Sequence, residues 1–145
     1  MDTDGFAYQR VYPTEMRKRL VGIVGMMGLF AISCGNTTPE EMASLAAKGY
    51  YEHLLEGEYE HFLQGKAGAD SLPEAYREQL LAGYKQFMAQ QERMHHGILD
   101  VRVAGAKTDS LLHYTNVFLV LCFGDSTNEQ VAVPMVEHNG SWRMR

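Results

Sequence analysis

The stretch YTNVFLVLCF, Tyr114–Phe123, decides the fold of this chain. Beyond Asn116 its residues are apolar at successive positions, which predicts a β-strand that is covered on both faces. Before it, from Ile98, apolar and polar residues alternate, as expected for a strand with one wetter face. We expect the turn between these two strands at residues 105–110.

Two further strands are expected between Phe123 and the C-terminus. Residues 124–128 (GDSTN) predict a turn, and residues 131–135 predict a third strand in which Pro134 marks an edge or a bulge. The pair Asn139-Gly140 is a strong hairpin signal. It leads to a short last strand around Trp142.

Helices are expected before the strands. Thr38 can cap a helix with Pro39 in its first turn, and Glu41 completes a capping box. An apolar stripe then runs to Leu54, a bend follows at residues 56–57, and a short helix ends at Gly65. A third helix begins near residues 72–74 and ends at residues 95–97. This order predicts an α+β domain, with N-terminal helices packed on a curved antiparallel four-stranded sheet.

The apolar outer side of Tyr114–Phe123 needs a cover in this arrangement. A dimer partner, a cavity wall and a chain terminus are the three alternatives.

The N-terminal region resembles an export signal. Three cations at residues 17–19 precede an apolar segment at residues 20–32, and Cys34 follows Ser33. This segment is too short to span a bilayer and contains three glycines. We therefore predict a lipoprotein signal at residues 16–33 and lipidation of Cys34, which places the protein at the bacterial cell envelope, periplasmic or surface-exposed.

The remaining boundaries follow from this signal. Residues 1–15 carry acidic charge ahead of the basic segment, so we interpret them as an over-called start before Met16. Residues 34–38 form the lipidated tether, and residues 39–145 form one domain.

Charge and cysteine content narrow the classes of partner. Thirteen Lys and Arg residues against 18 Asp and Glu give a formal net charge of −5. An acidic chain without a basic stripe disfavours nucleic-acid binding. If Cys34 carries lipid, Cys122 remains as a thiol inside an apolar run, where it is expected to act as a small hydrophobe.

Histidines raise the question of a metal site. Tyr51-Glu52-His53 and Tyr59-Glu60-His61 repeat at eight residues, but helical ligands are usually spaced by three or four. No third ligand has the expected spacing, and His95-His96 is explained as a helix end. We expect no metal and no cofactor.

Two groups of residues are candidates for chemistry or ligand binding. Asp100 could act as a general base with His113 or Tyr114 nearby, if an apolar pocket raises its pKa. A solvated sheet face containing Asp100 and Arg102 is the commoner arrangement. Aromatic and neighbouring residues could line a ligand pocket, although aromatics at helical spacing usually belong to the core: Tyr50, Tyr84, Phe87, Met88, Asn116 and Phe118.

Several short motifs together resemble a known superfamily. They are Tyr50 and Leu54 with Gly57-Glu58-Tyr59, then Leu72-Pro73, Phe123-Gly124-Asp125, Asn139-Gly140 and Trp142-Arg143. From about Pro39 to Arg145 the chain resembles the cystatin-like superfamily of nuclear transport factor 2-like domains, and more narrowly bacterial lipoproteins of unknown function with that cone-shaped fold. The resemblance implies an open pocket between helices and sheet and frequent homodimers through the outer sheet face. Ketosteroid isomerases and small polyketide cyclases in this superfamily use an aspartate base, but their catalytic motif does not map onto this chain.

The function expected from these observations is that of an exported, lipid-anchored, non-enzymatic domain. It would bind a small apolar ligand or another envelope protein. Two alternatives stay open: a pocket enzyme of the isomerase, cyclase or hydrolase type with Asp100 as base, and a structural subunit of an envelope assembly.

Overall fold

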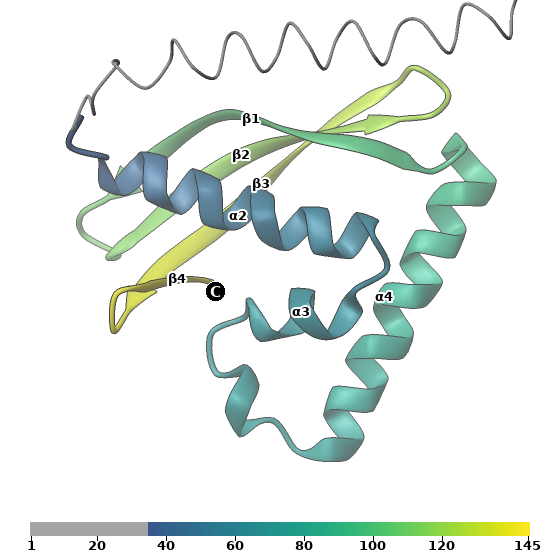
Figure 1. The fold of residues 1–145 in the computed structure, drawn as a ribbon, viewed down its shortest axis with the longest axis horizontal. Helices are drawn as coiled ribbons and strands as arrows, with labels where there is room; N and C mark the ends of the chain where they lie inside the picture. Colours follow the sequence, from purple (N-terminus) through teal and green to yellow (C-terminus); the bar gives the residue numbers. More distant parts are fainter. Residues whose placement is uncertain (1–34) are drawn as a thin grey trace, which may run out of the picture. The chain divides into compact units, whose positions relative to one another are not determined.

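The computed structural model describes residues 35–145, and residues 37–145 form one compact unit. The predicted signal and Cys34 lie outside the described residues. The elements, coloured along the chain in Figure 1, are the helices α2 (Pro39–Leu55), α3 (Tyr59–Gln64), η1 (Ala69–Ser71) and α4 (Glu74–His95), followed by the strands β1 (Ile98–Asp109), β2 (Tyr114–Phe123), β3 (Asn128–His138) and β4 (Ser141–Met144). Within residues 35–145, the helices are all too short or too polar to cross a membrane.

The four strands form an antiparallel meander in the order β1-β2-β3-β4, which confirms the predicted fold class. The predicted turn at residues 105–110 is wrong, because β1 continues to Asp109. A register shift between Val103 and Gly105 marks a bulge, so Gly105 bends the strand without ending it. The turn falls at residues 110–113, where the Asp109 carboxylate accepts hydrogen bonds from the backbone N–H groups of Leu111 and Leu112.

The core lies between α2 and the inner side of the sheet. Along β2, buried residues alternate with half-buried ones, as expected for a pleated strand. On α2 the buried positions include Ala43 and Ala47, both with no exposed surface. Their small side chains let the helix backbone approach the sheet closely, and Leu54 fills the space near the end of the helix.

The outer face of β2 is not fully buried, which differs from the prediction that both faces of this strand are covered. Its residues are half-buried: Tyr114, Asn116, Phe118, Val120 and Cys122. Phe118 lies between Gly105 on β1 and Ala132 on β3, whose small size leaves its ring partly accessible. In residues 35–145 most helical contacts of β2 come from α2, which packs on the inner side, and His95 at the end of α4 packs on Phe123.

The helix ends agree with the sequence signals. Thr38 accepts from the Glu41 backbone N–H at 3.2 Å, and Glu41 accepts from the Thr38 backbone N–H at 3.1 Å, which confirms the capping box. Helix α4 ends at His95 and is capped by His96, whose φ of 57° is left-handed; Gly97 follows with a φ of 83°. At the predicted hairpin, Asn139 and Gly140 also both have positive φ.

The last strand connects the sheet to the N-terminal helices. The Tyr50 hydroxyl donates to the Trp142 carbonyl at 2.8 Å. The backbone of Met144 accepts from Ala67 N–H at 2.7 Å and donates to the Gly65 carbonyl at 2.8 Å. These bonds join α2, the segment after α3 and β4 into one unit.

Helix α4 runs past α3 and reaches the sheet at the C-terminal end of the helix, where β1 begins (Figure 1). Not one of its residues is buried. Tyr84 and Met88 pack against the core, but Tyr76 is 49% exposed and Phe87 39% exposed. Helix α4 therefore covers its apolar side chains only in part, because it makes few contacts with the sheet.

Candidate functional site

The chain between α2 and α3 turns through a Schellman motif. Gly57 has a φ of 79°, the left-handed conformation that glycine adopts without strain. Its N–H donates to the Leu54 carbonyl at 3.2 Å, and the Glu58 N–H donates to the His53 carbonyl at 2.8 Å. The second bond holds residue 58 over the last turn of α2.

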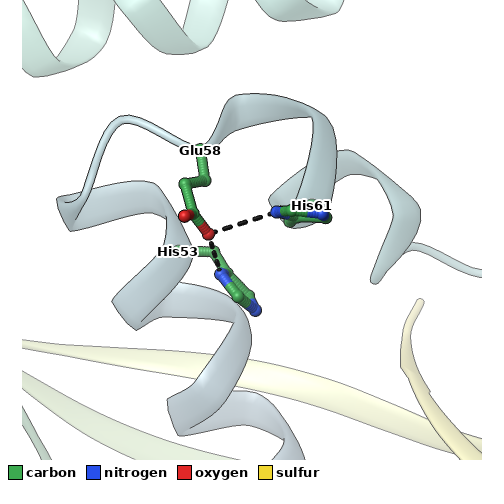
Figure 2. Close-up of side chains that lie close together, drawn as sticks. All are labelled: His53, Glu58 and His61. Carbon is green, nitrogen blue, oxygen red and sulfur yellow. Dashed lines mark hydrogen bonds and ion pairs between the residues drawn. The ribbon is translucent and has the colours of Figure 1, made fainter.

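This turn brings three polar side chains together. Glu58 is the N-cap residue of α3, and His61 follows three residues later on the first turn. One Glu58 carboxylate oxygen lies 2.5 Å from Nδ1 of His53 and 3.1 Å from Nδ1 of His61. Figure 2 shows both imidazoles converging on that oxygen, and the ring centroids are 5.0 Å apart. We call His53, Glu58 and His61 the bend cluster.

The bend cluster is open to solvent. Its side chains are 41% exposed for His53, 43% for Glu58 and 59% for His61. Hydrogen bonding to His53, and then to His61, lowers the pKa of the Glu58 carboxyl. The Glu58 side chain is therefore a carboxylate at neutral pH, and it can accept a hydrogen bond or bind a cation.

A shallow hollow of about 320 Å³ lies next to the bend cluster. Its lining is contributed by residues 57–61 and by Leu81 of α4. Solvent and small molecules can thus reach the Glu58 and His61 side chains from the side of α4.

The prediction that no third potential ligand accompanies the two histidines is wrong, because Glu58 lies beside both. The spacing of eight residues corresponds to about two turns of an α-helix, and the bend expected at residues 56–57 was not used to bring the two histidines together. The glycine turn shortens that path and inserts Glu58 between them. The available signal was a histidine four residues before a helix-ending glycine, followed by an acidic N-cap.

A second region is the end of the domain where α2 begins at Pro39. The Glu40 carboxylate accepts a hydrogen bond from the Thr108 hydroxyl near the end of β1, and this bond lowers the pKa of Glu40. The β1–β2 turn follows directly. Its two leucines point outward, with Leu111 88% exposed and Leu112 59% exposed.

A groove of about 490 Å³ runs between α2 and β1 near the same end. Its apolar part is contributed by Leu45, which is 67% exposed, and by Val103. The groove is lined by Thr37, Glu40, Glu41, Ser44, Leu45, Val103, Gly105 and Ala106.

Asp100 does not have the environment that a general base would need. Its carboxylate is exposed on the outer side of the sheet and accepts from Nε of Arg102 at 3.1 Å and from the Val101 N–H at 2.9 Å. The bond from Arg102 lowers the pKa of Asp100, the opposite of the expected increase. His113 lies in the β1–β2 turn, at the other end of β1, so the structure does not bring the two residues together.

The six predicted pocket residues do not line one pocket. Tyr50 points from α2 to β4, and Tyr84 and Met88 of α4 pack on the core. The Tyr84 ring meets Phe62 edge-on at 4.9 Å, and its buried hydroxyl has no hydrogen-bond partner within residues 35–145. Burial raises the pKa of Tyr84.

The other three candidates lie elsewhere. Phe87 faces solvent on α4. Asn116 and Phe118 are on the outer side of β2, separated by the sheet from α2. The expectation of one aromatic pocket is therefore corrected, because strand alternation and the path of α4 divide its members among three surfaces.

Comparison with solved structures gives a match for this architecture. It is a crystal structure described as "Putative NTF2-like transpeptidase from CAMPYLOBACTER JEJUNI", with a TM-score of 0.54, 13% sequence identity, and coverage of 68% of this chain and 92% of that chain. The chain has the NTF2-like fold. The resemblance seen in the sequence is thus confirmed at the level of the fold, and at 13% identity the NTF2-like match carries no activity with it. No family model and no curated protein sequence matches the chain.

Proposed function

We propose that this chain is an exported lipoprotein whose NTF2-like domain is held against a membrane of the cell envelope and acts there as a non-enzymatic binding domain. Cys34 carries the lipid. The ligand is another envelope protein, which contacts the groove between α2 and β1.

The observation that carries the membrane assignment is the exposed pair Leu111 and Leu112 at the tether end of the domain. Residues 35–38 can span at most roughly 14 Å, which keeps the start of α2 close to a lipidated Cys34. The Glu40–Thr108 hydrogen bond joins that start to the β1–β2 hairpin. A leucine side chain that leaves water fully contributes about 1.5–3 kcal/mol, so this turn can hold one end of the domain on the lipid surface.

Two observations favour a protein over a small enclosed ligand. The residues proposed for an internal pocket are divided among three surfaces, whereas the groove is open along α2 and presents Leu45 and Val103. Exposed apolar side chains with a polar rim are typical of protein contacts. Glu40 and Glu41 supply that rim.

Lipidation is tested by mass spectrometry of the full chain recovered from bacterial membranes. We expect the mature N-terminus to be an acylated Cys34, and Cys34→Ala to remain unprocessed. Cys122→Ala is the matched control and should be processed like the wild type. Peptides from residues 1–33 in the mature protein, or a free thiol at position 34, would contradict the proposal.

Membrane contact is tested with Leu112→Trp in the same lipidated chain. The added indole should be quenched by brominated acyl chains beyond the signal of the parent chain, which retains Trp142. Asn128→Trp is the control, because Asn128 begins β3 at the opposite end of β2. Equal quenching at the two positions would exclude an oriented contact.

A further inference from the structure

We propose that the bend cluster, His53, Glu58 and His61, binds a divalent transition-metal ion, and that Zn²⁺ suits its donor atoms best. This inference is independent of the membrane anchor.

The donor set has the right chemistry. Two imidazole nitrogens and one carboxylate oxygen are preferred zinc ligands, and sites with three protein ligands keep further positions for water or a ligand. The exposure of His53 and His61 leaves room for those positions. The hollow that ends at His61 and Leu81 gives a small molecule access to such a metal.

The distances fit after a small adjustment. One donor atom from each of the three residues lies within 4.8 Å of the other two. Zinc bonds of about 2.0–2.2 Å in a tetrahedron place two ligand atoms roughly 3.4 Å apart. The 3.1 Å between Glu58 and His61 is already close to this value, and the 2.5 Å to His53 must widen. Rotation of the exposed Glu58 side chain provides that movement without a change of backbone.

The backbone holds the ligands before a metal arrives. The hydrogen bond from Glu58 N–H to the His53 carbonyl fixes the first pair. Glu58 and His61 are fixed by the first turn of α3, whose Phe62 N–H donates to the Glu58 carbonyl at 3.1 Å. Burial of Phe62 and Leu63 anchors that short helix to the domain. Ordering the site therefore costs little beyond side-chain rotation.

Neighbouring cations do not oppose a bound metal. Lys48 forms an ion pair with Glu52 at 3.3 Å, and Arg77 pairs with Glu60. Each cation is thus matched by its own carboxylate.

Calorimetric titration of the full chain with ZnCl₂, in detergent and without a polyhistidine tag, tests the proposal. We expect one Zn²⁺ per chain. His53→Gln, Glu58→Gln and His61→Gln should each weaken binding by at least about 10–100-fold, the loss that removal of even an outer partner of a ligand causes. His138→Gln and Glu56→Gln are matched controls that should bind within about twofold of the wild type.

A second measurement identifies the coordinating atoms. In ¹⁵N-labelled chain, Zn²⁺ should shift the Nδ1 resonances of His53 and His61 and leave those of His138 unchanged. Far-UV circular dichroism shows whether each variant remains folded. The proposal is overturned if the wild type binds no Zn²⁺, or if the folded His53→Gln/His61→Gln double variant binds it with unchanged affinity.

Discussion

Helices α2 and α4 carry apolar stripes of similar character, but they are held to the domain in different ways. Helix α2 has 17 residues and buries Ala43, Ala47 and Leu54 against the sheet and its surroundings. Helix α4 has 22 residues and buries none. The difference teaches that the apolar stripe alone does not decide burial: α2 has alanines where it meets the sheet, which permits close approach.

Polar contacts near both ends hold α4 in addition to the packing of Tyr84 and Met88. Arg77 pairs with Glu60 of α3 in the first turns, and Nδ1 of His95 lies 2.8 Å from the Asp125 carboxylate at the last turn. The backbone N–H groups of Gly124 and Asp125 also donate to the Gly97 and His95 carbonyls, each at 3.0 Å. The attachment of α4 should therefore be more sensitive to pH than that of α2.

The largest expected loss of stability comes from shortening a buried side chain of α2. Leu54→Ala removes a side chain that is 3% exposed, and we expect a loss of about 2–5 kcal/mol in the free energy of unfolding. The same change on α4, Leu80→Ala, affects a half-buried side chain and should cost about 1 kcal/mol or less. Urea denaturation of both variants checks this. Equal losses would mean that α4 is as deeply packed as α2.

A smaller effect is expected at the end of α2. Gly57→Ala places a side chain at a φ of 79° and should reduce stability by about 1–2 kcal/mol, although nothing lies within 4 Å of the new Cβ. Gly49→Ala, inside the same helix and also in open space, should increase stability by about 0.5–1 kcal/mol. Denaturation curves with opposite shifts support the turn as described. A stabilised Gly57→Ala variant would contradict it.

The smallest effect is pH-dependent and concerns the end of α4. Hydrogen bonds from the Thr127 hydroxyl, then from His95 and the Thr127 N–H, lower the pKa of Asp125 from 3.8 to about 2. A carboxyl with a lowered pKa stabilises the folded state above its unfolded pKa, and this contribution disappears as the pH falls from about 4 to about 2. Asp125→Asn should therefore be less stable than the wild type at pH 7, and the difference should shrink towards pH 2.

Unfolding measurements at pH 7, 4 and 2 follow that difference, and Asn128→Asp, at the start of β3 beside this turn, serves as a control for a change of charge. Amide exchange of Gly124 and Asp125 reports whether the loss is located at the α4 end. A difference between wild type and Asp125→Asn that is constant over this range would exclude the ionised carboxyl as its origin.

Local signals in the sequence predict much of this fold. The capping box at Thr38, the bounds of Tyr114–Phe123 and the hairpin at Asn139-Gly140 each depend on a few adjacent residues, and the structure confirms them. The length of β1 does not depend on local residues alone. Gly105 fits a turn or a bulge equally well, and pairing along the full length of β2 selects the bulge.

The candidate site was less accessible to sequence reasoning. Helical spacing excludes a pairing of His53 with His61, and only the geometry of the glycine turn brings Glu58 between them. At Asp100 residue spacing is more informative, because strand alternation places Asp100 and Arg102 on one face, and the structure shows the solvated pair that was given as the commoner arrangement. The bend cluster, in contrast, depends on how side chains meet in space, which residue spacing does not describe.

The contacts of β4 with Tyr50 and with residues 65–67 have a consequence for biosynthesis. The Tyr50–Trp142 hydrogen bond joins residues that are 92 positions apart, and Met144 completes the backbone bonds of the segment after α3. While only the helices have emerged from the ribosome, their partners Trp142 and Met144 are not yet present. The native state therefore forms after nearly the whole chain has emerged. Such late closure would keep the polypeptide unfolded during the export that we propose.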